Sequence, residues 1–283
     1  MILISDCGST KADWKILKSS GEVGHQSTRG FNPFIQNSVT IESMLQEDFD
    51  DSLVKKEVKE VFFYGAGCSD NYRCNIVETA LQQIFPNAKI KVHHDLLASA
   101  RALCGTEAGI ACILGTGSNS CLYDGIEVID NVTNIGSLLG DEGSGMHLGK
   151  ELLRGYFYRE MPEEIRTAFE VYCPDGKRGI LNKAYDSPAP NVYLASFSKF
   201  LSQNSSHPYI QNIVFNCFDE FITRHVLKYD GNQKIKIHFV GSVAFHYKAI
   251  LDVVLASHSL TLGKVIKKPI DSLVAFHQKM ATQ

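Results

Sequence analysis

The sequence lacks the features that would define a membrane, nucleic-acid-binding or fibrous protein. No run approaches the roughly 18 consecutive apolar residues of a membrane helix. Lys and Arg total 28 against 31 Asp and Glu, so the formal charge of −3 leaves no basic surplus for nucleic acid or an anionic membrane. No low-complexity tract stands out. What remains is ordinary globular composition, 44% hydrophobic and 21% charged, in 283 residues that suit one large domain or two modest ones.

A secretory signal and a cysteine-based metal site are also missing from the sequence. The segment 1–6 is apolar but ends at Asp6, without a basic region or a small-residue cleavage site. The eight cysteines include no CxxC pair and offer no clustered ligands for zinc or an iron–sulfur cluster. Several lie in apolar runs such as Ile110–Leu114, so we expect buried free thiols in a cytoplasmic protein.

One order of elements, strand-strand-strand-helix-strand-helix-strand-helix, is predicted twice along the chain. Hydrophobic periodicity and turn signals place the strands of the first copy at 2–6, 12–17, 23–29, 61–64 and 90–92, and its helices at 38–49, 70–84 and 94–103. The second copy has strands at 110–114, 120–123, 126–130, 234–240 and 261–266, a helical block at 147–229, and helices at 243–257 and 270–281. Ser38 or Thr40 is expected to cap the first helix, and Asp70 the second.

Each copy begins with a strand, a turn of small residues and a second strand. This duplication predicts an α/β protein of two domains that face each other across a cleft. The expected boundaries are 1–106 for the first domain, which the last helix 270–283 rejoins, and 107–269 for the second, which carries helical insertions.

The turn of the first copy, Asp6-Cys7-Gly8-Ser9-Thr10-Lys11, has the residue types of a phosphate and metal site. Backbone N–H groups of a tight hairpin can point at phosphate oxygens, and Gly8 permits a close approach. Thr10 can add a hydroxyl donor and Lys11 a positive charge. Asp6 can hold Mg²⁺ through water, because Mg²⁺ keeps most of its hydration. The alternative is an ordinary hairpin turn.

The turn of the second copy is Gly115-Thr116-Gly117-Ser118-Asn119, and it also joins two strands. Two such loops facing each other could clamp a triphosphate. A plain turn is again the alternative, but the same position in both copies weighs against it. Further along, Gly241-Ser242 separates a strand from a helix, which would let a flat nucleotide base pack against the backbone.

Asp95 is the candidate general base, because it stands between a strand and a helix, at the edge of a cleft. The alternative is that Asp95 is only the N-cap of its helix, and both roles can coexist. The neighbouring His93 and His94 lack the spacing of a metal pair on one helical face, so they are interpreted as structural.

Two further segments suit a polar ligand. Asp141 lies in the glycine-rich loop Gly140-Asp141-Glu142-Gly143-Ser144-Gly145 before a helix, where its carboxylate could accept hydrogen bonds from sugar hydroxyls. Asn32 follows the third strand and is presented by the stiff Pro33. For both segments, a solvated turn is the alternative.

Taken together in this order, these segments resemble the sugar kinase/Hsp70/actin ATPase superfamily, and within it the N-acetylglucosamine kinases. That family also contains the benzoyl-CoA reductase activator-type ATPases. The resemblance covers nearly the whole chain and implies two duplicated ribonuclease H-like (actin-like ATPase) domains. One departure is Asn134-Ile135-Gly136, where such kinases often carry Gly-x-Gly. The bridging cysteines of the activator branch have no counterpart here.

The resemblance also implies a role for each matched residue. Asp95 would be the catalytic base, and Asp6 would place Mg²⁺ through water. ATP would be bound by Gly8, Ser9, Thr10, Lys11, Gly115, Thr116, Gly117, Gly241 and Ser242. The sugar would be bound by Asn32, Asp95, Ser118, Asn119, Gly136 and Asp141.

The sequence therefore predicts an ATP- and Mg²⁺-dependent kinase that acts on the primary (6-) hydroxyl of an amino sugar. N-acetylglucosamine is the first candidate, with glucosamine, N-acetylmuramic acid and N-acetylmannosamine as alternatives. No nucleic acid or membrane partner is expected, and a homodimer is possible. The rival hypotheses are an activator-type ATPase that drives a partner protein and a catalytically silent sugar sensor.

Overall fold

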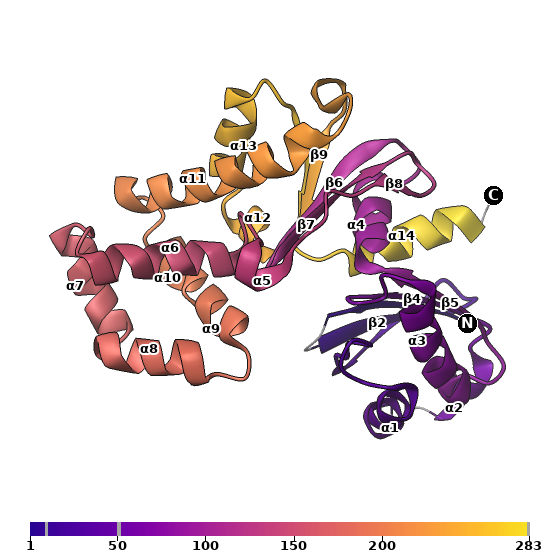
Figure 1. Ribbon diagram of the computed structural model, residues 1–283. Coiled ribbons are helices and arrows are strands. Elements are labelled where there is room, and N and C mark those ends of the chain that lie inside the picture. The colour runs from indigo at the N-terminus through magenta and orange to yellow at the C-terminus, as the bar shows by residue number, and fades with distance from the viewer. Residues whose placement is uncertain (9–10, 50–51, 282–283) are drawn as a thin grey trace. The chain divides into compact units, whose positions relative to one another are not determined.

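The computed structural model describes residues 1–8, 11–49 and 52–281 (Figure 1). The described chain separates into two compact units, Met1–Thr106 with Pro269–Gln283, and Glu107–Lys268. Ser9 and Thr10, two of the expected ATP-binding residues, lie outside the described residues. The predicted functional domains, 1–106 with 270–283 and 107–269, stay a prediction.

The first unit is built on a mixed sheet with the strand order β3-β2-β1-β4-β5. Its strands are β1 (Ile2–Cys7), β2 (Lys11–Leu17), β3 (Val23–Arg29), β4 (Glu60–Gly65) and β5 (Lys89–His94). The first three form an antiparallel meander, whereas β1, β4 and β5 run parallel. Its helices are α1 (Ser38–Asp48), α2 (Ser52–Glu57), α3 (Asn71–Ile84), α4 (Asp95–Cys104) and α14 (Ile270–Ala281).

Aromatic side chains fill the core of the first unit. The Trp14 ring meets Phe49 edge-on at 5.2 Å between centroids, and Phe63 lies 5.8 Å from it. Phe31 stacks on Phe63 at 5.4 Å. Burial of Trp14 requires a partner for its indole N–H, which donates to the Thr28 hydroxyl at 2.9 Å. This core fixes the sheet whose strand ends carry the candidate residues.

The last helix, α14, packs on the first unit beside α4 (Figure 1). A buried hydrogen bond joins Tyr64 OH and His277 Nε2 at 2.9 Å, and Arg101 Nη1 donates to the same hydroxyl at 2.8 Å. The His277 ring also lies 3.9 Å from the Phe62 ring. These contacts tie the C-terminal helix to β4 and to α4, which begins at Asp95.

The second unit repeats the sheet of the first. Its strand order is β10-β9-β6-β7-β8, formed by β6 (Gly109–Leu114), β7 (Ser118–Tyr123), β8 (Val128–Asp130), β9 (Ile237–Val240) and β10 (Leu262–Ile266). As in the first unit, the earliest strand is central, with an antiparallel hairpin on one side and parallel strands on the other. The predicted duplication and the α/β fold class are thereby confirmed.

The helices of the second unit cover this sheet and extend from it. They are α5 (Gly136–Leu139), α6 (Gly145–Tyr158), α7 (Glu163–Tyr172), α8 (Gly176–Asp186), α9 (Pro190–Ser196), α10 (Ser198–Gln203), α11 (Pro208–Arg224), α12 (Ser242–His246) and α13 (Lys248–Ser257), with 3₁₀ turns at Val226–Lys228 and Asn232–Lys234. A single apolar core that includes Leu148, Phe169, Phe218 and Phe239 joins them to the sheet.

Some local predictions were wrong. Neither Ser38 nor Thr40 caps α1, because Asn37 precedes them and its side chain accepts the Thr40 N–H at 2.9 Å. The predicted helix 243–257 breaks at Tyr247, whose buried hydroxyl donates to the Ser198 carbonyl at 3.0 Å. Asp70 does cap α3 as expected.

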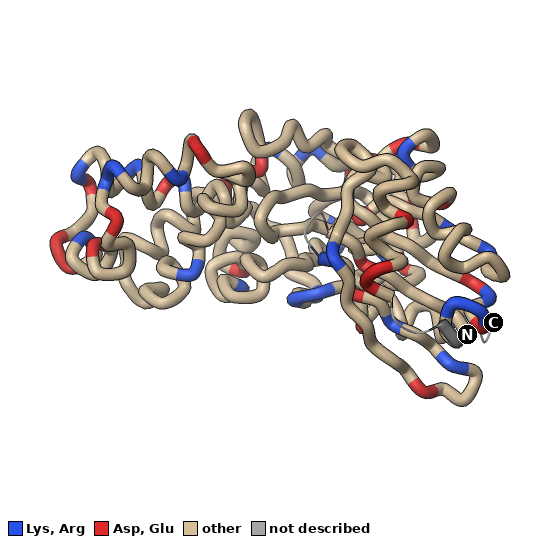
Figure 2. Tube along the Cα trace, turned by 90° about the horizontal axis from the view of Figure 1, so that it is seen from below, with Lys and Arg blue, Asp and Glu red and all other residues tan. Residues whose placement is uncertain are grey.

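Two surface properties follow from the composition. None of the helices in the described ranges is long and apolar enough to cross a membrane. Acidic and basic residues are both scattered along the trace (Figure 2), as the small net charge leads one to expect.

We expect the stability of the protein to fall as the pH drops below about 6.5. Burial, followed by the charges of Arg101 and Lys91, lowers the pKa of His277 to about 3. In the unfolded chain, His277 therefore becomes protonated near pH 6.5. In the folded chain, it becomes protonated only at a much lower pH. Within that window, His277 alone should reduce the free energy of unfolding by up to about 1.4 kcal/mol per pH unit.

Urea unfolding at several pH values from about 8 down to about 4.5 measures this dependence. His277→Gln can keep a hydrogen bond to Tyr64 but does not titrate, so its stability should depend less steeply on pH. His246→Gln, at an exposed position, is the matched control and should keep the wild-type slope. Equal slopes for His277→Gln and wild type would contradict the role given to His277.

Candidate active site

In the first unit, strand register brings two candidate carboxylates to one edge of the sheet. Cys7 is level with Gly65 on β4, and Gly65 is level with His94 on β5. Asp6 precedes Cys7 and Asp95 follows His94, so both stand at the carboxyl ends of parallel strands. With one strand between β1 and β5, their backbones are about 10 Å apart. Ligands of open α/β sheets bind at such edges.

The described part of the first glycine turn is closed by a backbone hydrogen bond from Gly8 N–H to the Lys11 carbonyl at 3.0 Å. The Lys11 ammonium lies 2.8 Å from Asp13 Oδ1, and this carboxylate also accepts the Ser27 hydroxyl at 2.9 Å. The Lys11 side chain is 55% exposed. Lys11 is therefore paired with Asp13 in this structure, and a phosphate would have to compete with that carboxylate.

Asn32 sits in the turn after β3. Its N–H donates to Gln36 Oε1 at 2.7 Å, and its side-chain oxygen accepts the Phe34 N–H at 2.9 Å. Gly67, with φ of +83°, lies so close that any Cβ there would collide with this oxygen. The side-chain oxygen Oδ1 of Asn32 thus accepts a hydrogen bond within its own loop, and this bond fixes the direction of the side chain.

Asp95 is the first helical residue of α4, and the cap is His94. His94 Nδ1 accepts the Leu96 N–H at 3.1 Å, so the prediction that Asp95 itself serves as the N-cap was wrong. A carboxylate in the first turn is favoured by the helix dipole. The Asp95 side chain is 31% exposed, while its Oδ1 atom is buried and lies 2.9 Å from His94 Nδ1.

In the second unit, the turn after β6 docks on the start of α6. Gly115 N–H donates to the Gly117 carbonyl at 2.9 Å, and the Gly115 and Thr116 carbonyls accept N–H groups of Gly145 and Met146 at 2.8 and 3.2 Å. The following strand begins at Ser118, two residues earlier than the hydrophobic pattern predicts. The turn is therefore held by backbone bonds that leave little room for movement.

The turn at Gly241-Ser242, predicted to bind adenosine, lies beside the Gly115–Asn119 turn, predicted to bind phosphate. Ile113 on β6 is level with Val240 on β9, and Gly241 follows with φ of +126°. A Cβ at Gly241 would collide with the Leu114 carbonyl. Only glycine fits this close approach, so the position of Gly241-Ser242 next to Gly115 is fixed by backbone contact.

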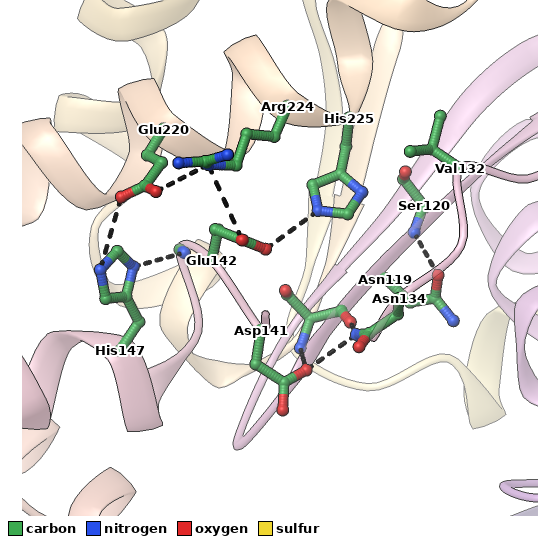
Figure 3. Close-up of polar contacts among 12 residues, drawn as sticks. Asn119, Ser120, Val132, Asn134, Asp141, Glu142, His147, Glu220, Arg224 and His225 are labelled. Atoms are coloured by element: carbon green, nitrogen blue, oxygen red, sulfur yellow. Dashed lines mark hydrogen bonds and ion pairs between the residues drawn. The ribbon is translucent and has the colours of Figure 1, made fainter. Parts of the chain in front are cut away.

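Asp141 is the most constrained of the candidate sugar ligands (Figure 3). It adopts the left-handed region with φ of +58°, although it is not glycine, and is 8% exposed. Its Oδ1 accepts the Ser118 N–H at 2.9 Å and the Asn134 amide at 2.8 Å. Such local strain persists only where surrounding contacts determine it.

The neighbours of Asp141 form a polar network around it. Asn134 also donates to the Ser118 carbonyl and accepts the Gly136 N–H at 2.5 Å, so it links Gly136, Ser118 and Asp141. The Ser118 hydroxyl is buried without a hydrogen-bond partner in the described structure. Asn119 accepts the Ser120 N–H at 2.9 Å. The sequence analysis gave Asn134 no role, because an amide two residues before a glycine carries no signal of its own.

Glu142 points away from Asp141, toward His225 and Arg224 on and after α11 (Figure 3). Its carboxylate lies 3.1 Å from His225 Nε2 and 3.8 Å from Arg224 Nε. Burial acts to raise the pKa of Glu142, but backbone and His225 hydrogen bonds offset it, so the pKa falls below its ordinary value. This ionised group anchors the glycine loop to a helix about eighty residues later in the chain.

His147 holds the other end of the same loop. Its Nδ1 accepts the Gly143 N–H at 3.1 Å, and its Nε2 lies 3.7 Å from Glu220 Oε2. Burial lowers the pKa of His147, in keeping with an unprotonated Nδ1 that accepts this bond. Neither His147 nor His225 could be recognised from the sequence: the contact of His147 with Gly143 is local but follows no residue pattern, and the contact of His225 with Glu142 depends on where α11 packs.

The residues present fit a magnesium ion. In the described ranges, no cluster of three or more His, Cys, Asp or Glu side chains could hold a metal by protein ligands alone. Mg²⁺ does not need such a cluster, because it is commonly bound by one or two carboxylates, water and substrate phosphates. Asp6, a hard oxygen donor at the end of β1, is the residue that would hold it.

Comparison with known proteins places this fold. Neither family models nor curated proteins give a match. Among solved structures, a protein from Porphyromonas gingivalis, provisionally named an N-acetylglucosamine kinase, is 41% identical, with 99% of each chain covered and a TM-score of 0.93. A protein from Chromobacterium violaceum with the same provisional name is 14% identical, covers 97% of this chain and 98% of its own, and has a TM-score of 0.69.

A glucokinase from Streptomyces griseus, solved with glucose and AMPPNP, shares the fold at 14% identity, 98% coverage of both chains and a TM-score of 0.54. The duplicated sheets and the glycine turns define the class of actin-like ATPase folds that includes sugar kinases. The 41% identity to the Porphyromonas gingivalis protein over the full length narrows this class to one family. The chain belongs to the N-acetylglucosamine kinase-like family of the sugar kinase/Hsp70/actin superfamily, a family of ATP-dependent sugar kinases.

We expect Gly117→Ala to destabilise the protein, because a Cβ there would lie 2.8 Å from Asp141 Oδ1. The carboxylate would have to leave its two donors, at a cost of about 1–3 kcal/mol. Gly115→Ala is the matched control in the same turn, since the nearest atom to its Cβ would be 4.0 Å away. Denaturant unfolding should separate the two variants, and equal stabilities would contradict the contact between Gly117 and Asp141.

We also expect His225→Leu to lower the free energy of unfolding by about 2 kcal/mol, because it leaves the Glu142 carboxylate without its closest cation or donor. His225→Gln supplies an amide that can donate to Glu142, so it should recover most of the loss. Denaturant midpoints of the three proteins test this. If Leu and Gln at this position were equally stable, hydrogen bonding to Glu142 would not be the reason for the effect.

Proposed function

We propose that this protein transfers the γ-phosphoryl group of ATP to the primary (6-) hydroxyl of an amino sugar, with N-acetylglucosamine as the first candidate. The observation that carries the proposal is the 41% identity, over 99% of both chains, to the Porphyromonas gingivalis protein named for that activity. The ordered carboxylates of Asp95 and Asp141 supply the chemistry it requires. The eight cysteines are all free, which agrees with a reducing compartment, and we propose the cytoplasm.

Phosphoryl transfer asks mainly for positioning and charge stabilisation. The sugar oxygen forms a bond to the γ-phosphorus while the bond from that phosphorus to the bridging oxygen breaks, and its electrons leave with ADP. Asp95 accepts the hydroxyl proton. The ATP-binding residues we assign are Gly8, Ser9, Thr10 and Lys11 in the first unit and Gly115, Thr116 and Gly117 in the second. The Gly8 and Gly115 N–H groups close their own turns, so we assign these glycines to the close approach of phosphate to backbone. Bound Mg²⁺ would offset phosphate charge at Asp6.

The second unit supplies most of the proposed sugar contacts. Asp141 has its Oδ1 engaged, so the remaining oxygen is the one we assign to a sugar hydroxyl. The buried Ser118 hydroxyl has no partner in the described structure and suits the same ligand. Asn119, the Gly136 backbone and Asn32 complete the proposed set, and the Gly241-Ser242 turn is assigned to adenosine.

The test is ADP release by the purified protein with Mg·ATP, measured with and without a panel of amino sugars. One sugar should raise release many-fold and be recovered as its 6-phosphate, as phosphorus NMR can establish. Rapid release without any sugar would instead favour an ATPase that drives a partner protein. No release with any sugar would favour a sugar sensor.

Asp95→Asn tests the proposed base, since it keeps size and removes basicity. We expect kcat to fall at least about 100-fold. Asp271→Asn is the matched control, because Asp271 is another first-turn carboxylate of the same unit and is 80% exposed. It should retain wild-type kcat. A folded Asp95→Asn enzyme with near-normal kcat would exclude Asp95 as the base.

A further inference from the structure

His94 makes two contacts that place opposite demands on one nitrogen atom. As the cap of α4, His94 Nδ1 accepts the Leu96 N–H at 3.1 Å, which requires a bare lone pair. The same Nδ1 lies 2.9 Å from Asp95 Oδ1. A carboxylate oxygen also offers lone pairs, so this second contact is favourable only when a proton lies between the two atoms.

The carboxylate has no other source of a donor at that oxygen. Asp95 Oδ1 is buried and has no hydrogen-bond partner among the described residues. The side chain as a whole is 31% exposed, so its accessible part lies away from Oδ1. Among the described residues, the ionic contact of this oxygen is with His94 Nδ1, so the protonation state of that imidazole acts directly on the carboxylate.

We propose, on the basis of the proposed function, that His94 is a positioning residue for Asp95. His94 caps α4 when it is neutral and pairs with the Asp95 carboxylate when it is protonated. In the neutral state, His94 Nδ1 accepts the Leu96 N–H, and the Asp95 carboxylate is left to accept the sugar proton. In the protonated state, Nδ1–H donates to Asp95 Oδ1, the positive charge opposes transfer of the sugar proton to this carboxylate, and the cap on Leu96 is released. The protonated form is therefore the less active one.

The charged and titratable surroundings support this coupling. Burial acts to lower the pKa of His94, but hydrogen bonding and charge from Asp95 outweigh it, so the pKa lies above its ordinary value. Register places Cys7 and Gly65 on the same face of the sheet as His94, and Asp6, Tyr64 and His93 on the opposite face.

Three thiols are titratable groups on the His94 side, and the carboxylates of Asp70 and Glu78 act on one of them, Cys74. Cys7 on β1 and Cys68 after β4 have thiol pKa values raised by burial, so neither competes as a charged partner. Cys74 on α3 contacts Cys68, and burial raises the pKa of its thiol as well. Among the described contacts of His94, Asp95 is thus the one carboxylate partner.

His94→Asn separates the two contacts. Asn is among the best N-cap residues, so its side-chain oxygen can keep the Leu96 bond, but it does not titrate. We expect this variant to keep the wild-type melting temperature. Wild-type kcat with the best sugar should fall on the acid side along a limb of about tenfold per pH unit, and in His94→Asn that limb should move to lower pH.

Three further variants make the outcome decisive. His94→Ala should shift the pH profile in the same way but also lower the melting temperature, because it removes the cap. His246→Asn, at an exposed position, should leave profile and stability unchanged. An unaltered acid limb in His94→Asn, or a uniform loss of kcat at every pH, overturns the inference. The proposed function fails if no amino sugar raises ADP release. If it holds but Asp95→Asn remains fully active, Asp95 is not the base and the role of His94 fails with it, whereas an inactive Asp95→Asn with an unaltered His94→Asn profile defeats only the role of His94.

Discussion

The candidate sugar site depends on one constrained contact, the Asp141 carboxylate against the Gly115–Ser118 turn. Gly117 has no side chain, so Asp141 Oδ1 can approach the Ser118 N–H to 2.9 Å. The strained backbone of Asp141 is held by anchors on both sides, Glu142 on His225 and Gly143 on His147. A binding carboxylate thereby gains a fixed direction, which a flexible glycine-rich loop alone would not give it.

The first unit uses a different device for the same purpose. Parallel strands β1, β4 and β5 end level with one another, so the acids at the carboxyl ends of β1 and β5 share one edge of the sheet. The hydrogen bonds of Tyr64 with His277 and Arg101 then tie α14 to α4, the helix that starts at Asp95. The C-terminal helix thus belongs to the support of the proposed base, although it is the last element of the chain.

The fixed Asp141 carboxylate and the level ends of the parallel strands suit phosphoryl transfer, because this reaction requires the protein mainly to position the reacting groups. Backbone amides and glycine contacts do not titrate, so the phosphate turns keep their geometry over a wide pH range. The groups that can change state are the carboxylates and the histidines beside them. In both units a histidine stands next to a functional loop or carboxylate, His94 beside Asp95 and His147 beside the Asp141 loop. The proposed backbone contacts to phosphate are therefore made by groups that do not titrate, whereas the groups that respond to protonation are the carboxylates and the histidines beside them.

The strand order, the duplication and the fold class were predictable from the sequence, because local periodicity and turn residues act over short distances. The glycine turns and Asp95, Asp141 and Asn32 were identifiable for the same reason, although their roles remain proposals. The short helices α2 and α5 were missed. Three features were not predictable: the cap at Asn37, the break at Tyr247 and the ion pair of Lys11 with Asp13. Each was decided by a choice among neighbouring residues or by packing against distant ones. Glu142, His147 and His225 form an anchor only because α6 and α11 pack together, and no periodicity along the chain records which buried side chains will meet. Sequence thus determined which residue types stand at the ends of strands, and tertiary packing decided which of their oxygens are held and which remain for a ligand.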